Sequence, residues 1–228
     1  MAVSPPPARA GGSFLIEAHP HEEVLTPERF PEELRLMAAS ARRFVELEIT
    51  PELAALESLD YDLIRSRLLR AGELGLLGID VPEEHGGLGA GKTATLVVAE
   101  SMAASGSFNV TYNAHSSIGT LPLVYFGSEG QKSRYLPGLT SGRLVGAYCL
   151  SEPSSGSDAR AAKTVARPDP EGGGYRLTGS KMWITNAGFA DLFTVFAQVP
   201  SAEGPQLTAF LLERDTPGVA FGEEEEKM

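Results

Sequence analysis

The chain has 228 residues, enough for one large domain or two small ones, and 42% of them are hydrophobic, enough for a real core. Its formal net charge of −11 argues against a nucleic-acid or anionic-lipid partner. Cys149 is the single cysteine, so the sequence excludes an intrachain disulfide and a cysteine-based metal site. We therefore expect a reducing, cytoplasmic location, no membrane span and no metal.

The first 143 residues predict a tail followed by helices. Residues 1–26 begin with a proline-rich stretch and contain no apolar signal core, so we expect a disordered or extended tail. Residues 27–143 are expected to form a helical domain, and Thr26-Pro27-Glu28 is typical of a helix start. The apolar residues that follow recur at spacings of three and four and predict one buried face: Phe30, Leu34, Met37, Ala41, Val45 and Ile49.

Further helices are expected after Pro51, which should break or restart the first one. They cover Tyr61 to Leu69, 92–104 and 110–126, and a capping box at Ser128–Gln131 predicts one more start. The glycine-rich stretch 85–89 lacks the Lys-Ser/Thr ending of a phosphate-binding loop. We interpret it as a tight loop between helices that needs positive φ, with phosphate binding as the alternative.

The pattern changes near Leu144. Short segments rich in Val, Thr, Phe and Tyr then alternate with turn clusters, and predict strands at 144–150, 175–178, 182–185, 192–199 and 207–212. No strand–helix alternation typical of a parallel Rossmann sheet is present. The predicted fold class is α+β: an N-terminal helical bundle followed by an antiparallel β-barrel-like domain over 144–228.

Two segments carry most of the functional information, Tyr148–Asp158 and Gly179–Asn186. Each places small hydroxyl residues beside an aromatic ring at the end of a predicted strand, which suits a pocket for a flat, hydrogen-bonding cofactor. Taken singly, Trp183 is explained as a core tryptophan, Ser151 and Thr185 as strand residues, and 154–158 as a turn. Their occurrence together favours the pocket.

Tyr148-Cys-Leu-Ser-Glu-Pro-Ser-Ser-Gly-Ser-Asp158 and Lys181-Met-Trp-Ile-Thr-Asn186 resemble, in order, the two flavin motifs of the acyl-CoA dehydrogenase family. The helical half is also similar, through Ala114–Gly119, Phe126–Lys132 and Tyr135–Pro137. The resemblance covers roughly residues 27–228, the family's N-terminal and middle domains. The wording of Gly188–Ala197 is most similar to the very-long-chain branch.

The resemblance implies FAD as cofactor and a fatty acyl-CoA thioester as substrate, which is converted to the trans-2-enoyl-CoA. It also implies an electron-transfer flavoprotein as acceptor and a homo-oligomer. The implied cofactor residues are Tyr148, Cys149, Leu150, Ser151, Ser157, Trp183, Ile184 and Thr185. Ser157 is implied to meet the acyl-CoA as well.

Specific roles follow from the same resemblance. Backbone amides near Leu150 and the Ser151 hydroxyl suit the pyrimidine edge of the flavin, where charge accumulates on reduction. The Thr185 hydroxyl is implied to lie near N5, with Trp183 against the ring system. Ser151 stands where the family usually has threonine. Serine keeps the hydroxyl group and lacks the methyl group.

In this family a third, helical domain supplies the catalytic glutamate, and no segment of the chain resembles it. Glu152 is not at the position of the base, so we expect no catalytic residue in this chain. We also expect the middle domain to be incomplete. Without the third domain, the Leu34, Ala41 and Val45 stripe is expected to be exposed. The alternative to a dehydrogenase fragment is a non-catalytic module that binds flavin or acyl-CoA, or packs against a partner.

Cys149 is expected to be a small buried hydrophobe, and His115 to pack within the helices or to lie near an acyl chain.

Overall fold

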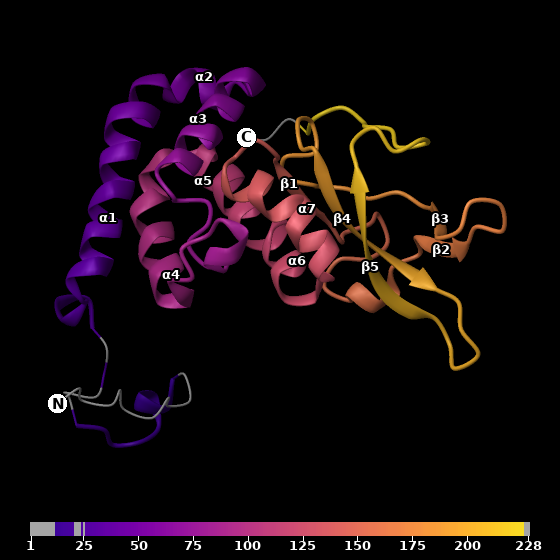
Figure 1. The fold of residues 1–228 in the computed structure, drawn as a ribbon, viewed down its shortest axis with the longest axis horizontal. Coiled ribbons are helices and arrows are strands. Elements are labelled where there is room, and N and C mark those ends of the chain that lie inside the picture. Colours follow the sequence, from indigo (N-terminus) through magenta and orange to yellow (C-terminus); the bar gives the residue numbers. More distant parts are fainter. Residues whose placement is uncertain (1–11, 21–23, 25, 226–228) are drawn as a thin grey trace.

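The computed structural model describes residues 12–20, 24 and 26–225, so residues 1–11, 21–23 and 25 of the predicted tail lie outside the described residues. Helices occupy one side of the molecule and strands the other (Figure 1). The helices are α1 (Glu32–Phe44), α2 (Leu53–Glu57), α3 (Tyr61–Glu73), α4 (Gly91–Met102), α5 (Ser107–Asn113), α6 (Leu121–Phe126) and α7 (Glu129–Thr140). Within the described residues no helix is long and apolar enough to cross a bilayer.

The first long helix begins later than predicted. Pro27–Arg29 is a 3-10 turn without a side-chain cap from Thr26, and α1 starts at Glu32 directly after Pro31. A π-helical turn, Val45–Ile49, and a 3-10 turn, Thr50–Glu52, then lead into α2, so Pro51 interrupts the helix as predicted.

The expectation of an exposed stripe on α1 is wrong. Ala41 and Val45 are buried, and Leu34 packs against the same core, because α1 lies along α4. The apolar face of α1 is therefore covered by the chain's own helices.

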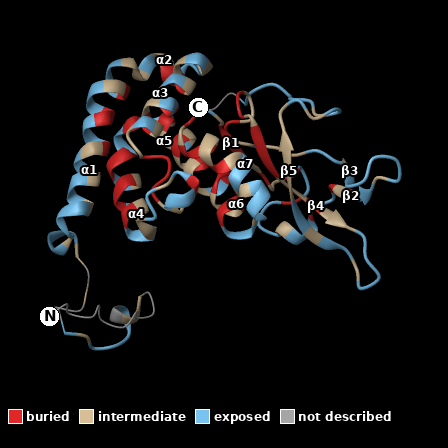
Figure 2. Cartoon of the chain, in the orientation of Figure 1, coloured by how far each residue is buried: buried red, intermediate tan, exposed pale blue. Residues whose placement is uncertain are grey.

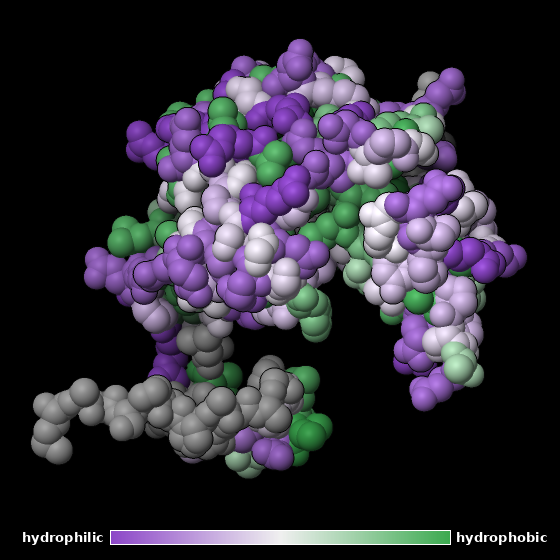
Figure 3. Space-filling model, turned by 45° about the vertical axis from the view of Figure 1, so that its right-hand side comes forward, coloured by the Kyte–Doolittle hydropathy of each residue, from purple (hydrophilic) through white to green (hydrophobic). Residues whose placement is uncertain are grey.

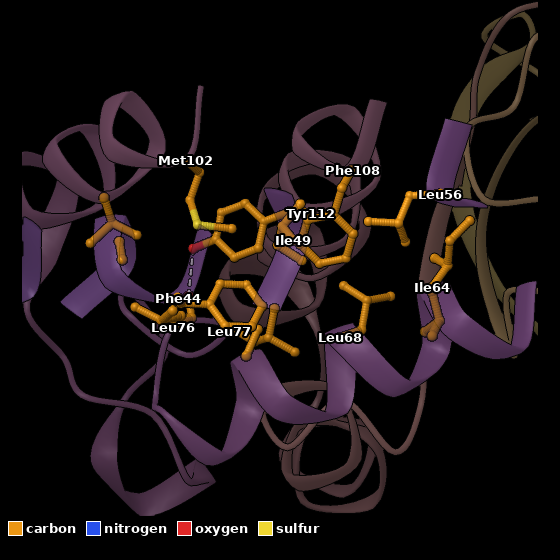
Figure 4. Packing of buried hydrophobic residues seen from close by; sticks show 14 of the residues in the cluster. Phe44, Ile49, Leu56, Ile64, Leu68, Leu76, Leu77, Met102, Phe108 and Tyr112 are labelled. Atoms are coloured by element: carbon orange, nitrogen blue, oxygen red, sulfur yellow. Dashed lines mark hydrogen bonds between the residues drawn. The ribbon is translucent and has the colours of Figure 1, made fainter. Parts of the chain in front are cut away.

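Large apolar side chains from several helices fill the space between them (Figure 4). Leu68 of α3, Met102 of α4 and Phe108 of α5 are almost completely buried there. Tyr112 joins this core and its hydroxyl donates to the Leu76 carbonyl at 2.6 Å. Buried residues are concentrated where the helices face one another (Figure 2). This burial is the main stabilising contribution, at roughly 25 cal/mol per Å² of apolar area.

Two local predictions for the loops are confirmed. Gly86 and Gly89 have φ of 86° and 58°, as a tight loop between helices requires. The loop is tied back to residues 78–81 by backbone hydrogen bonds. Ser128 and Gln131 form the predicted capping box, in which the Gln131 side chain accepts from the Ser128 amide at 2.9 Å.

Five strands follow, β1 (Gly146–Cys149), β2 (Val165–Pro168), β3 (Tyr175–Thr178), β4 (Leu192–Val199) and β5 (Gln206–Glu213). β4–β5 and β2–β3 are antiparallel, but β1 and β2 both run parallel to β4 along one of its edges. The sheet is thus mixed and not purely antiparallel as predicted, because the long connection from β1 to β4 brings the chain back in its original direction. The architecture is α+β, with the helical part first, as predicted.

The two parts meet where β1 packs against a π-helical turn, Ala114–Gly119. A Cβ atom on Gly146 would lie 3.0 Å from the Gly119 carbonyl oxygen, so the absence of side chains allows this approach. On the face drawn in Figure 3 a hollow separates the helical part from the strands, and hydrophobic side chains gather within it.

Candidate functional site

A shallow pocket lies where the two singled-out segments meet. It has a volume of about 160 Å³ and is lined by Ala114, Ile118, Tyr148, Leu150, Ser151, Trp183, Ile184 and Thr185. Six of the eight predicted cofactor residues therefore come together, although about thirty residues separate the two segments in the chain. Cys149 and Ser157 are the two that do not line it.

The geometry of β1 explains why the neighbours Tyr148 and Cys149 lie in different surroundings. Side chains alternate along a strand, so Tyr148 faces the pocket while Cys149 is buried in the helical core. The Tyr148 ring packs on Phe196 of β4, with centroids 5.0 Å apart. Burial raises the pKa of the Cys149 thiol to about 12, so it stays protonated at neutral pH. Cys149 is the small buried hydrophobe that the sequence indicated.

The predicted strand 182–185 is wrong, since these residues form a turn. Trp183 and Asn186 both have positive φ, 56° and 72°, a region that non-glycine residues seldom occupy. The buried Asn186 side chain explains the turn, because its Nδ2 donates to the carbonyl oxygens of Thr111 at 3.1 Å and Gly146 at 3.4 Å. Trp183 is 63% exposed as a result, which excludes a core tryptophan.

The pocket offers unpaired hydrogen-bond donors. In the part of the chain that the structure describes, the hydroxyls of Ser151 and Thr185 and the amides of Leu150 and Ser151 have no protein partner. Donors of this kind, next to an exposed aromatic ring, fit the polar edge and the flat face of an isoalloxazine ring. The volume is below the roughly 300 Å³ at which sites for whole ligands begin. The pocket accordingly fits one edge of a ring system and not a complete dinucleotide.

Ser157 lies away from this pocket. It is exposed, and the neighbouring residues form a turn in which the Ser155 hydroxyl donates to the Asp158 carbonyl at 2.7 Å. The explanation of 154–158 as a turn therefore holds for its backbone.

Sequence reasoning missed a buried ion pair directly behind the pocket. The Lys181 Nζ lies 2.7 Å from Glu152 Oε1 and donates to the Leu150 carbonyl at 3.1 Å. Burial opposes ionisation of Glu152, but hydrogen bonds from Lys181 and from the amides of Lys163 and Thr164 outweigh it and lower its pKa to about 2. The sequence held one signal for this pair: the first motif contains the acidic Glu152, and the second contains the basic Lys181.

The π-helical turn supplies a second wall that the sequence did not predict. Ala114 and Ile118 line the pocket, four residues apart and therefore on one face of a helix. His115, between them, is fully buried. Its Nε2 lies 3.0 Å from the Leu139 carbonyl and its Nδ1 accepts from the Gly146 amide at 3.0 Å, so the ring packs within the fold. Burial lowers the pKa of His115 to about 4.

Residues 182–190 form the pocket loop, and two arginines hold its second half. Arg214 donates to the carbonyl oxygens of Ala187 at 2.9 Å, Ala190 at 3.0 Å and Gly188 at 2.8 Å. Arg65 donates to the Phe189 carbonyl at 2.6 Å and pairs with Asp191. The loop is held from both the helical part and the sheet.

Comparisons with known proteins agree with this geometry. Residues 31–143 match the family model of the acyl-CoA dehydrogenase N-terminal domain, and residues 147–228 match that of the middle domain. The chain belongs to the acyl-CoA dehydrogenase family.

Its similarity to individual members of the family is high. A probable acyl-CoA dehydrogenase of Bacillus subtilis is 46% identical over the whole chain. The human mitochondrial very long-chain specific acyl-CoA dehydrogenase is 40% identical over 93% of it. A crystal structure of an acyl-CoA dehydrogenase from Bacillus anthracis, complexed with FAD, superposes with a TM-score of 0.91 over 96% of the chain, at 46% identity. The chain spans 38%, 33% and 37% of these three proteins, respectively.

A larger cavity of about 470 Å³ lies between α7 and the β4–β5 pair and is lined by none of the predicted cofactor residues. Three of its polar side chains are engaged with one another: Arg134 and Tyr135 both bond to Glu213, at 2.5 and 2.7 Å. The described residues include no group of three His, Cys, Asp or Glu side chains that could hold a metal ion.

Proposed function

We propose that this chain forms the flavin-facing part of an FAD-dependent acyl-CoA dehydrogenase, which desaturates the α,β bond of a fatty acyl-CoA. The convergence of two separate motifs on one pocket with unpaired donors carries this proposal. Bound FAD supplies the oxidising chemistry, by accepting the hydride that leaves the substrate.

The chain's own residues bind and orient the cofactor. The amides of Leu150 and Ser151, with the Ser151 hydroxyl, donate to the polar edge of the flavin ring. The Thr185 hydroxyl provides a further donor, and the exposed Trp183 indole covers one side of the ring system. Tyr148, Ile184 and the backbone of Cys149 complete the wall, and Ser157 is proposed to meet the cofactor and the acyl-CoA from the adjoining turn.

The base that removes the α-proton is not among the residues around the pocket. None of the described residues that line it carries a carboxylate. Glu152 is nearby, but it is buried, accepts hydrogen bonds from Lys181 and two amides, and has a pKa lowered to about 2. Such a carboxylate is too weak a base and too enclosed to take a proton from the substrate. We therefore propose that residues 1–228 alone bind flavin but do not dehydrogenate.

The decisive experiment is a titration of the purified chain with FAD, followed by flavin fluorescence, and an assay for acyl-CoA-dependent dye reduction. We expect saturable FAD binding without turnover. Thr185→Val should weaken binding by about two- to tenfold, since a hydrogen bond between neutral groups contributes about 0.5–1.5 kcal/mol. Thr178→Val makes the same change at an exposed position of β3 and serves as the control.

Failure of the wild-type chain to bind FAD, or equal effects of the two valine variants, would contradict the proposed site. Turnover that saturates with acyl-CoA would contradict the statement about the base, and Glu100 and Glu152 would then be the first carboxylates to test.

The partners of the proposed enzyme follow from the same reaction. We propose a fatty acyl-CoA as substrate, an electron-transfer flavoprotein as acceptor, and assembly as a homo-oligomer in the cytoplasm. The length of the acyl chain is left open. The domain limits 1–26, 27–143 and 144–228 likewise stay predictions, with limited proteolysis as their test.

A further inference from the structure

The Glu152–Lys181 pair lies behind the pocket, and its two members come from the two segments that line it. Their side chains are 3% and 10% exposed, respectively. Removing two charges from water costs several kcal/mol per ion, so a buried pair is retained only with very good geometry. A pair of apolar residues would fill the same space at lower cost, so the pair does more than fill it.

Each charged group of this pair has several partners in the surrounding backbone. The Lys181 ammonium group donates to Glu152 Oε1 and to the Leu150 carbonyl. The Glu152 carboxylate also accepts from the Lys163 amide at 2.6 Å and the Thr164 amide at 3.0 Å. The pair therefore connects the end of β1, the pocket loop and the start of β2.

The backbone reinforces this connection at one point. The Met182 amide donates to the Ser151 carbonyl at 3.1 Å, immediately next to the ion pair. Ser151 contributes an unpaired hydroxyl to the pocket, and Met182 precedes Trp183 in the loop. Any displacement of Lys181 would change the separation of these two pocket walls.

We propose that Lys181 is a positioning residue that fixes the Leu150–Ser151 wall of the pocket relative to the 183–185 loop. This inference rests on the proposed function and deepens it. Lys181 does not touch the cofactor in this proposal, because its ammonium group is directed to Leu150 and Glu152. It acts by fixing the distance between donors on opposite walls, so that both reach the same ring.

A purely structural role is the competing explanation, and the two differ in which part of the chain responds. Loss of a structural contact would lower the stability of the whole fold. Loss of a positioning contact loosens the pocket walls while the fold persists. Amide hydrogen exchange of segments 148–152 and 181–187, measured well below the unfolding temperature, separates these outcomes and requires no flavin.

The test compares Lys181→Met with Lys163→Met in the full chain. Lys163 is exposed, and its backbone amide, which serves Glu152, is retained in the variant. We expect Lys181→Met to accelerate exchange in the two pocket segments and to weaken FAD binding by up to about tenfold, because displaced walls lose about one donor contact to the ring. Lys163→Met should change neither, and Lys181→Arg should recover part of both.

The double variant Glu152→Gln with Lys181→Met guards against simple unfolding, because it leaves no unpaired buried charge. We expect it to regain the unfolding temperature lost in Lys181→Met but not the slow exchange or the FAD affinity. Recovery of all three together, or wild-type exchange and affinity in a folded Lys181→Met variant, would overturn the inference. If the wild-type chain fails to bind FAD, the proposed function fails, and the exchange measurement alone decides the role of Lys181.

Discussion

The helical core and the pocket loop reach their order by different means. In the core, Leu68, Met102 and Phe108 exclude water from one another, and their helices need no unusual backbone. In the loop 182–190 two non-glycine residues have positive φ, and polar bonds from distant elements hold the backbone. The core is fixed by a local, periodic pattern, whereas the loop depends on single long-range contacts. Damage to the core should therefore affect stability first, and damage to the loop should affect binding first.

The largest expected effect lies in the core. Leu68→Ala should lower the free energy of unfolding by about 2–5 kcal/mol, because a fully buried leucine leaves a cavity. Leu69→Ala, at a neighbouring side chain that is 41% exposed, should cost much less. Urea denaturation measures both. FAD affinity of the folded Leu68→Ala fraction should be unchanged, and a large loss there would erase the distinction between core and loop.

His115 tests the junction between the two regions through pH. Its pKa in the folded chain, about 4, lies below the ordinary imidazole value of 6.5, so the unfolded chain binds the proton more readily. The neutral ring contributes roughly 3 kcal/mol to the free energy of unfolding. This contribution is complete above about pH 6.5 and is lost as the pH falls to about 4. Denaturation of His115→Gln at the same pH values should give a flatter profile. An equally steep profile would assign the acid sensitivity to other groups.

Asn186 tests what holds the loop. Asn186→Gly removes the side-chain bonds to Thr111 and Gly146 but accepts positive φ, whereas Asn186→Ala loses the bonds and adds strain. We expect Asn186→Ala to be less stable than Asn186→Gly by about 1 kcal/mol. Both should bind FAD more weakly than the wild type. Equal stability of the two variants would mean that backbone strain at this position contributes nothing.

The smallest effect on stability is expected at Trp183. An indole that is 63% exposed contributes little to folding, so Trp183→Ala should change the free energy of unfolding by less than about 0.5 kcal/mol. The same variant should lose FAD affinity, which fluorescence titration can measure. Tyr175→Ala, an exposed aromatic of β3, is the matched control. A marked loss of stability in Trp183→Ala alone would place this residue on the core side of the comparison.

Features encoded in short stretches of sequence could be predicted. The capping box at Ser128, the interruption at Pro51 and the positive φ of Gly86 all follow from the properties of one or a few neighbouring residues. The two motifs also indicated the pocket, because their hydroxyl residues Ser151 and Thr185 both line it.

Features set by distant contacts could not be predicted. The turn at 182–186 reads as a strand until the bonds of Asn186 to Thr111 and Gly146 are known. The parallel pairing of β1 with β4 depends on the course of a long connection, which strand propensity does not describe. The pairing of Glu152 with Lys181 joins positions 29 residues apart and has no periodicity to reveal it.

The three carbonyl groups that converge on Arg214 also impose an order on the synthesis of the chain. The helical part, which ends with α7 at Thr140, emerges from the ribosome long before Arg214 does. Since folding units form as they emerge, the helices can assemble while the segment 187–190 still lacks the group that gathers its carbonyls. The pocket therefore takes shape after the helices, and a ribosome stalled before residue 214 would hold formed helices beside an unformed pocket.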